Sequence, residues 1–109
     1  MRTIKSRQDF EHVYLQGKRY NHPLVRMVVC PSQEDGVQGR VAFAASKRVG
    51  NAVTRNRSKR VLRETARACE MPVSGFDVIL FATKRTKDAS PDEMTSALSS
   101  LIRRAGLHG

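Results

Sequence analysis

Residues 46–60 combine a glycine turn with a dense run of cationic side chains, a spacing suited to binding a polyphosphate. They read Ser-Lys-Arg-Val-Gly-Asn-Ala-Val-Thr-Arg-Asn-Arg-Ser-Lys-Arg. The wider segment 40–67 carries nine of the chain's 20 lysines and arginines but only one of its 10 acidic residues, Glu64. It therefore holds +8 of a formal net charge of +10. Because concentrated positive charge attracts a nucleic-acid backbone, the sequence indicates binding to RNA or DNA.

The pattern predicts a helix from about residue 52 to residue 69 that displays these cations on one side. The arc expected to face the core holds Ser58, Val61, Leu62, Thr65, Ala66 and Cys69. Arg55, Lys59 and Arg63 follow one another at i,i+4, which is unfavourable without an anionic partner. A solvated face is the alternative explanation. A membrane surface is a weaker one, because the helix lacks the Trp or Phe anchors of a membrane-lying helix, and an acidic protein partner stays open.

The remaining polar residues do not predict a catalytic site or a protein-borne metal site. His12, His22 and His108 are scattered, without a carboxylate or cysteine at metal-ligand spacing. No nucleophile elbow, phosphate loop or dinucleotide fingerprint occurs. Cys30 and Cys69 are expected to be buried thiols in a reducing cytoplasm. We therefore expect neither catalytic residues nor metal ligands in the polypeptide.

The length and element order predict a single domain, residues 1–109, of the α+β class. The expected elements are a helix at 6–16, strands at 24–30 and 40–46, the basic helix, a strand at 76–83 and a helix at about 90–106. Residues 31–39 are expected to form a turn, and an extra strand within 31–40 is the alternative that stays open. If the strands around the basic helix are parallel, the general rule predicts a right-handed crossover. No apolar run is long enough for a membrane span or a signal peptide, so we expect a cytoplasmic protein.

Residues 45–64 resemble the protein component of bacterial ribonuclease P. The core Arg-Asn-Arg-x-Lys-Arg follows directly on a Lys-Arg-x-Gly-Asn-Ala-Val turn, a combination specific to that family. The resemblance extends to Asp9-Phe10 and Val13-Tyr14 near the start and to residues 77–82 before the last helix. It therefore covers nearly the whole chain, strongly in the middle and loosely at the ends.

The resemblance implies an accessory subunit of a ribozyme. In that family a catalytic RNA subunit hydrolyses precursor tRNA at one phosphodiester and leaves the mature 5′ end, with Mg²⁺ held mainly by the RNA. The implied partners are ribonuclease P RNA and precursor tRNA, with no membrane and no obligate protein partner. The implied fold is a two-layer α–β sandwich, ribosomal-protein-like, with a small mixed sheet and a left-handed strand–helix–strand crossover between residues 40 and 83. That hand is opposite to the one the general rule predicts.

The resemblance also implies two RNA-binding sites. The residues expected to contact the catalytic RNA are Arg55, Asn56, Arg57, Lys59, Arg60 and Arg63. A cleft for the single-stranded 5′ leader of the substrate is expected to contain Phe10, Tyr14, Lys47 and Arg48. Aromatic faces stack on unpaired bases without demanding a sequence, although the two aromatic residues could instead be only the core stripe of an amphipathic helix. Residues 24–30 contain no aromatic residue, so weaker stacking is expected than in relatives that have one there.

Two other classes of function remain open at this point. A ribosomal or other structural RNA-binding protein would share the charge and the size, and the RNA that co-purifies would distinguish it. A self-sufficient protein nuclease would cleave RNA in Mg²⁺ without any RNA subunit.

Overall fold

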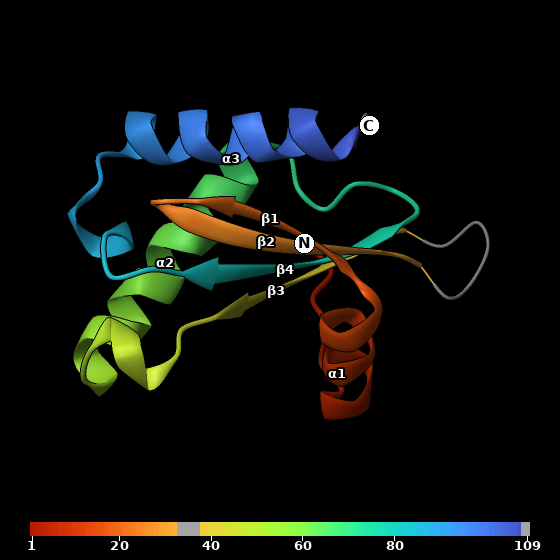
Figure 1. The fold of residues 1–109 in the computed structure, drawn as a ribbon, viewed down its shortest axis with the longest axis horizontal. Coiled ribbons are helices and arrows are strands. Elements are labelled where there is room, and N and C mark those ends of the chain that lie inside the picture. Colours follow the sequence, from red (N-terminus) through yellow and green to blue (C-terminus); the bar gives the residue numbers. More distant parts are fainter. Residues whose placement is uncertain (33–37, 108–109) are drawn as a thin grey trace.

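The computed structural model describes residues 1–32 and 38–107 and shows a mixed sheet with helices packed on it (Figure 1). The elements are α1 (Arg7–Gln16), β1 (Lys18–His22), β2 (Val25–Pro31), β3 (Arg40–Ala44), α2 (Ala52–Ala68), β4 (Phe76–Ala82) and α3 (Pro91–Ala105), with 3-10 helices at Lys47–Val49 and Thr86–Asp88. The sheet has four strands in the order β1-β2-β4-β3. Neighbouring strands are antiparallel except β3 and β4, which are parallel. The expected α+β class is confirmed.

The structure shows one strand that the sequence did not predict, β1, whereas the extra strand suggested within residues 31–40 falls largely on residues 33–37, which are not described. β1 reads Lys-Arg-Tyr-Asn-His and lies at the edge of the sheet, with its residues exposed or half-buried. A strand with so little buried surface has no apolar alternation, so its sequence gave no signal. The turn expected at 31–39 lies largely outside the described residues, because 33–37 are not described.

The crossover from β3 through α2 to β4 is left-handed, as the family resemblance implied. β3 and β4 are adjacent and parallel, and α2 lies behind the sheet in Figure 1. A right-handed crossover with the same strand order would place α2 on the opposite face. That face is occupied in part by α1, whereas α2 packs beside α3.

Each face of the sheet carries its own apolar cluster, because side chains alternate along a strand. The larger cluster joins the sheet to α2 and α3 and includes Met27, Val41, Val78, Leu80, Leu62, Leu98 and Leu101. The smaller cluster joins the sheet to α1 and contains Val13, Val28, Cys30, Ala42 and Ile79. The sheet and the α2–α3 layer thus form the α–β sandwich, and α1 covers part of the other face.

An ion-pair network fastens α1 to the sheet. Arg40 on β3 donates to Asp77 on β4 from Nε to Oδ1 (3.3 Å) and from Nη2 to Oδ2 (2.9 Å). Its Nη1 donates to Oδ2 of Asp9 on α1 (2.8 Å). The hydrogen bonds to Asp77 and then to Asp9 raise the pKa of the Arg40 guanidinium. Arg40 is therefore an internal structural cation and does not belong to the RNA-facing charge that the sequence assigned to residues 40–67.

A reciprocal capping box starts α3 and gives a testable pH dependence. The Ser90 hydroxyl accepts from the Glu93 N–H (3.1 Å), and the Ser90 N–H donates to Glu93 Oε1 (2.9 Å). The backbone and then the hydroxyl of Ser90 lower the pKa of Glu93. A lowered folded-state pKa stabilises the fold above the unfolded value of about 4.3, and this contribution is lost as pH falls through the folded pKa.

We therefore expect Glu93→Gln to unfold at lower urea than the native chain at pH 7, with the difference closing at about pH 3. Urea titrations at both pH values measure it. The same midpoint difference at pH 7 and pH 3 would show that the charge of Glu93 contributes nothing.

Candidate nucleic-acid interface

The glycine and asparagine of the basic motif set the start of α2. Gly50 has φ +147°, a region that favours glycine, and a Cβ there would lie 3.0 Å from the Thr54 side chain. Asn51 is the N-cap, and its side chain accepts from the Thr54 N–H at 2.9 Å. Arg55 Nη1 donates to the Gly50 carbonyl at 3.2 Å. Arg55 thus supports the turn that orients the helix.

The outer face of α2 presents Asn56, Arg57 and Arg60 to solvent, around a shallow depression of about 560 Å³ that Val53 also lines. The opposite side of the helix is fixed by its buried residues Ser58, Leu62, Thr65 and Ala66. In the part of the chain that the structure describes, no carboxylate forms an ion pair with any cation of α2. The cations are therefore held in place and remain available to an external anion.

The other predicted cations follow the flank of α2 nearest β3. Arg63 lies over the Phe43 ring of β3, with its guanidinium carbon 5.6 Å from the ring centroid. Lys59 and Arg55 are one and two i,i+4 steps away from Arg63 and so share its side of the helix. Both are half-buried. The six predicted residues thus form one continuous strip, with Asn56, Arg57 and Arg60 outermost.

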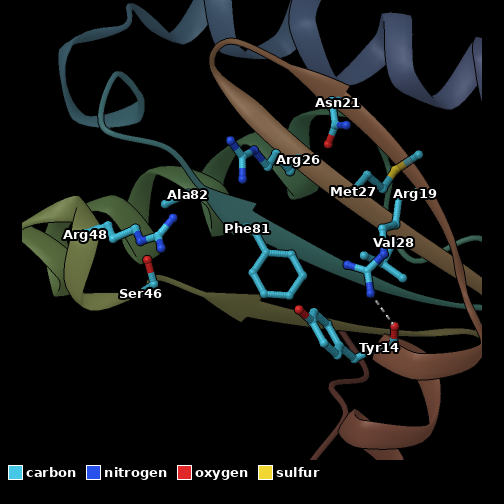
Figure 2. A pocket seen from close by; sticks show the side chains of 10 residues that line it. All are labelled: Tyr14, Arg19, Asn21, Arg26, Met27, Val28, Ser46, Arg48, Phe81 and Ala82. Atoms are coloured by element: carbon cyan, nitrogen blue, oxygen red, sulfur yellow. Dashed lines mark hydrogen bonds between the residues drawn. The ribbon is translucent and has the colours of Figure 1, made fainter.

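A cleft of about 560 Å³ lies on the α1 face of the sheet, beyond the end of α1 (Figure 2). Its lining residues are Tyr14, Arg19, Asn21, Arg26, Met27, Val28, Ser46, Arg48, Phe81 and Ala82. The floor is one cross-strand row, in which Asn21 pairs with Arg26, Arg26 with Phe81 and Phe81 with Ala44. The next row contains Val28, Ile79 and Ala42, which α1 covers through Val13. The cleft is therefore the uncovered end of this face.

Aromatic and cationic groups meet at the end of the cleft next to α1. The Tyr14 and Phe81 rings lie 5.8 Å apart at 61°, and the Phe10 and Phe81 rings lie 6.3 Å apart at 71°. Arg19 donates to the Tyr14 carbonyl (3.0 Å), and its guanidinium carbon lies 4.4 Å from the centroid of the Tyr14 ring. Figure 2 shows Arg48 and Ser46 at the other end of the cleft, with Arg26 between the ends. The cleft thus combines an aromatic floor with arginines along its length.

Comparison with known proteins identifies the family. The family described as Ribonuclease P matches residues 1–106. The chain belongs to the ribonuclease P protein family. The ribonuclease P protein component of Symbiobacterium thermophilum is 38% identical over 106 residues, covering 95% of this chain and 90% of that protein. The component from Clostridium novyi is 32% identical over 106 residues, covering 96% and 94%.

Solved structures agree with this assignment. The RNase P protein of Staphylococcus aureus has a TM-score of 0.81 and 25% identity, covering 100% of this chain and 99% of that one. The protein from Thermotoga maritima shares the fold, with a TM-score of 0.78, 22% identity and full coverage of both chains. Ribonuclease P is an endoribonuclease ribonucleoprotein that acts in tRNA 5′ maturation, and this chain is its accessory protein subunit, working with the RNA subunit and precursor tRNA.

The leader residues expected of this ribonuclease P protein lie only partly in the cleft. Tyr14 and Arg48 line it, whereas Phe10 and Lys47 are not among its lining residues. Phe10 instead packs against the Phe81 ring and belongs to the cluster under α1. These contacts are those expected if Phe10 belongs to the core stripe of an amphipathic helix.

Sequence reasoning missed Phe81, Arg26 and Arg19 as cleft residues. Phe81 lies in the apolar run of β4, which gave no sign of a binding surface, but Phe10 and Tyr14 of α1 cover only part of its ring and leave it half-buried. Arg26 carried a usable signal, since it is the one charged residue in the apolar run 24–30. Arg19 lies on the unpredicted strand β1, so its position could not be expected.

The described residues offer neither a metal cluster nor a membrane span. Within 1–32 and 38–107, no group of three or more His, Cys, Asp or Glu residues could hold a metal ion. Among the helices found in those ranges, none is long and apolar enough to cross a bilayer. Burial and then the negative charge of Asp77 raise the pKa of the Cys30 thiol, so Cys30 is a neutral core residue.

Proposed function

We propose that this ribonuclease P subunit binds two RNA segments on separate surfaces, the RNA subunit on α2 and the single-stranded 5′ leader of precursor tRNA in the cleft. The observation that carries the proposal is the segregation of cations that form no ion pair with a carboxylate among the described residues. One group lies on α2, which covers one face of the sheet, and the other surrounds Phe81 on the opposite face. One subunit can therefore contact both RNAs at once.

The α2 strip suits a structured RNA backbone. Arg55, Asn56, Arg57, Lys59, Arg60 and Arg63 extend over more than two helical turns, and their helix is fixed by its buried side. Fixed cations release counterions from the phosphates they contact, and this release supplies sequence-independent affinity. We assign these six residues to the RNA subunit.

The cleft suits an unpaired strand. Tyr14 and Phe81 offer aromatic surface for bases, and Arg19, Arg26 and Arg48 offer charge for phosphates. Lys47 lies beside Arg48 in the same short 3-10 helix and adds charge at that end, while Phe10 packs edge-on against the Phe81 ring. Leader binding here would help to hold the scissile phosphodiester at the catalytic RNA.

Catalysis in this proposal belongs to the RNA subunit, which would hold most of the Mg²⁺ used in hydrolysis. The polypeptide contributes binding and positioning, in a cytoplasmic enzyme. Its cations also lower the repulsion between the two RNAs, a role that Mg²⁺ would otherwise fill.

Reconstitution with a ribonuclease P RNA tests the proposal. With the protein present, precursor tRNA should be processed at low Mg²⁺, where the RNA alone is slow, and the protein alone should cleave nothing. Equal low-Mg²⁺ rates with and without the protein would contradict the role as a positioning subunit. Cleavage by the protein alone would instead indicate a protein nuclease.

Replacing Phe81 with leucine should weaken holoenzyme binding to precursor tRNA about tenfold while leaving binding to mature tRNA unchanged. Leucine keeps most of the buried volume but removes the flat ring on which a base stacks, a contact worth roughly 1–3 kcal/mol. Titration of both tRNAs measures the ratio. Ile79→Leu, a change on the same strand beneath α1, is the control, and equal loss for both tRNAs would indicate damaged folding instead.

A further inference from the structure

Phe81 is the one aromatic side chain in the floor row of the cleft. Figure 2 shows its ring face-on from the opening, with Tyr14 below it and Arg26 above it. The Tyr14 ring is already in contact with Arg19, whose guanidinium carbon lies 4.4 Å from the ring centroid. An incoming base therefore finds its open stacking surface at Phe81.

Arg26 is the direct cross-strand neighbour of that platform. Arg26 and Phe81 are register partners on β2 and β4, so their Cβ atoms lie roughly 5 Å apart on the same face. An arginine side chain in that position can reach the edge of a base stacked on the neighbouring ring.

Within residues 1–32 and 38–107, the Arg26 guanidinium donates no hydrogen bond to a protein group. Among the described residues, guanidinium hydrogen bonds to protein groups come from Arg2, Arg19, Arg40, Arg55 and Arg104. Arg26 is exposed, and no ion pair in those parts of the chain involves it. Its planar fork is available to a ligand in the cleft.

The three arginines of the cleft occupy different places. Arg19 and Arg48 lie toward opposite ends, where a strand crossing the cleft carries its phosphates past them, and Arg26 lies between them beside the ring (Figure 2). A stacked base turns its edge, not its phosphate, toward the group beside the ring. Guanine presents two adjacent acceptors, O6 and N7, that match the fork of an arginine, whereas adenine presents a donor at the equivalent of O6.

We propose that Arg26 and Phe81 form a base-reading subsite that prefers guanine at one position of the 5′ leader. The inference rests on the proposed function of the cleft and adds base selectivity to it. Phe81 supplies stacking that any base can use, and Arg26 supplies the discrimination.

The test uses the reconstituted holoenzyme and precursor tRNAs whose unstructured leaders lack guanosine except at one position, which is moved along the leader. We expect one position at which guanosine tightens binding about tenfold over adenosine. Substituting 7-deazaguanosine there should remove much of the gain, because N7 is lost. Equal affinities at every leader position would overturn the subsite.

The variant Arg26→Lys distinguishes the effect of the bidentate guanidinium from the effect of the positive charge alone. It keeps the positive charge but cannot make the bidentate contact, so the guanosine preference should fall to about onefold. Arg48→Lys, the same exchange at the end of the cleft, should retain the preference. A preference that survives Arg26→Lys, in a variant with unchanged thermal unfolding, would show that the base is read elsewhere.

The outcomes also separate this inference from the proposed function. If the native holoenzyme binds guanosine-free precursor more tightly than mature tRNA but shows no guanosine effect, the cleft binds the leader and only the subsite fails. If precursor and mature tRNA bind equally whatever the leader, both the cleft assignment and the subsite are wrong.

Discussion

Arg40→Met should lower the free energy of unfolding by about 3–5 kcal/mol, because it leaves a buried carboxylate without its cation. The Asp77 side chain is 2% exposed and receives two hydrogen bonds from Arg40. Methionine keeps most of the packing volume, so the loss reports the uncompensated charge and not a cavity. Urea unfolding followed by circular dichroism measures it.

The double variant Arg40→Met/Asp77→Val makes this interpretation testable. Removing both partners of a buried ion pair is often close to neutral, so the double variant should recover most of the lost stability. Asp88→Ala is the control, since its pair with Lys87 is long (3.7 Å) and Asp88 is 76% exposed, and it should change stability by less than about 1 kcal/mol. A double variant as unstable as Arg40→Met alone would show that packing, not charge, causes the loss.

Arg57→Ala/Arg60→Ala should weaken assembly with ribonuclease P RNA about 40-fold at 0.1 M monovalent salt. Each lost phosphate contact lowers the slope of log affinity against log salt by about 0.7–0.9, and at 0.1 M each unit of slope corresponds to about tenfold. Both side chains are exposed on α2 and form no ion pair within the described ranges. The fold should therefore be unaffected.

The measurement is RNA binding at several salt concentrations, and the slope should fall by about 1.4–1.8. Arg7→Ala/Arg103→Ala is the matched control, because it removes two exposed arginines from α1 and α3 and lowers the net charge equally. An identical loss in this control would mean that net charge, not the α2 strip, governs assembly.

Local sequence was sufficient for the elements whose signals lie within a few residues of one another. The i,i+4 spacing of the basic helix, the Asn51 cap and the Ser90–Glu93 capping box all act within one helical turn, and the basic helix is present as expected. The proposed binding role of α2 rests on the same kind of local signal, since helical period alone puts its cations and its apolar residues on different sides.

The cleft depends on contacts between distant segments. Its floor joins β1, β2, β4 and β3, and one position of slippage in any pairing would turn a floor residue to the other face. The sequence showed aromatic and cationic residues but not which of them would meet, so Phe10 was expected in the cleft and Phe81 was not.

The chain alone thus determined the charged helix, its caps, most strands and, through its motif, the family. Tertiary structure decided that Arg40 forms ion pairs with Asp9 and Asp77, which lie 31 and 37 positions away in the sequence. It also decided that Arg26 lies beside Phe81 in the row of the sheet that forms the floor of the cleft. The physical reason is that a helix repeats its own pattern within a few residues, whereas the partners of a strand and the reach of a covering helix are fixed only when separate segments pack together.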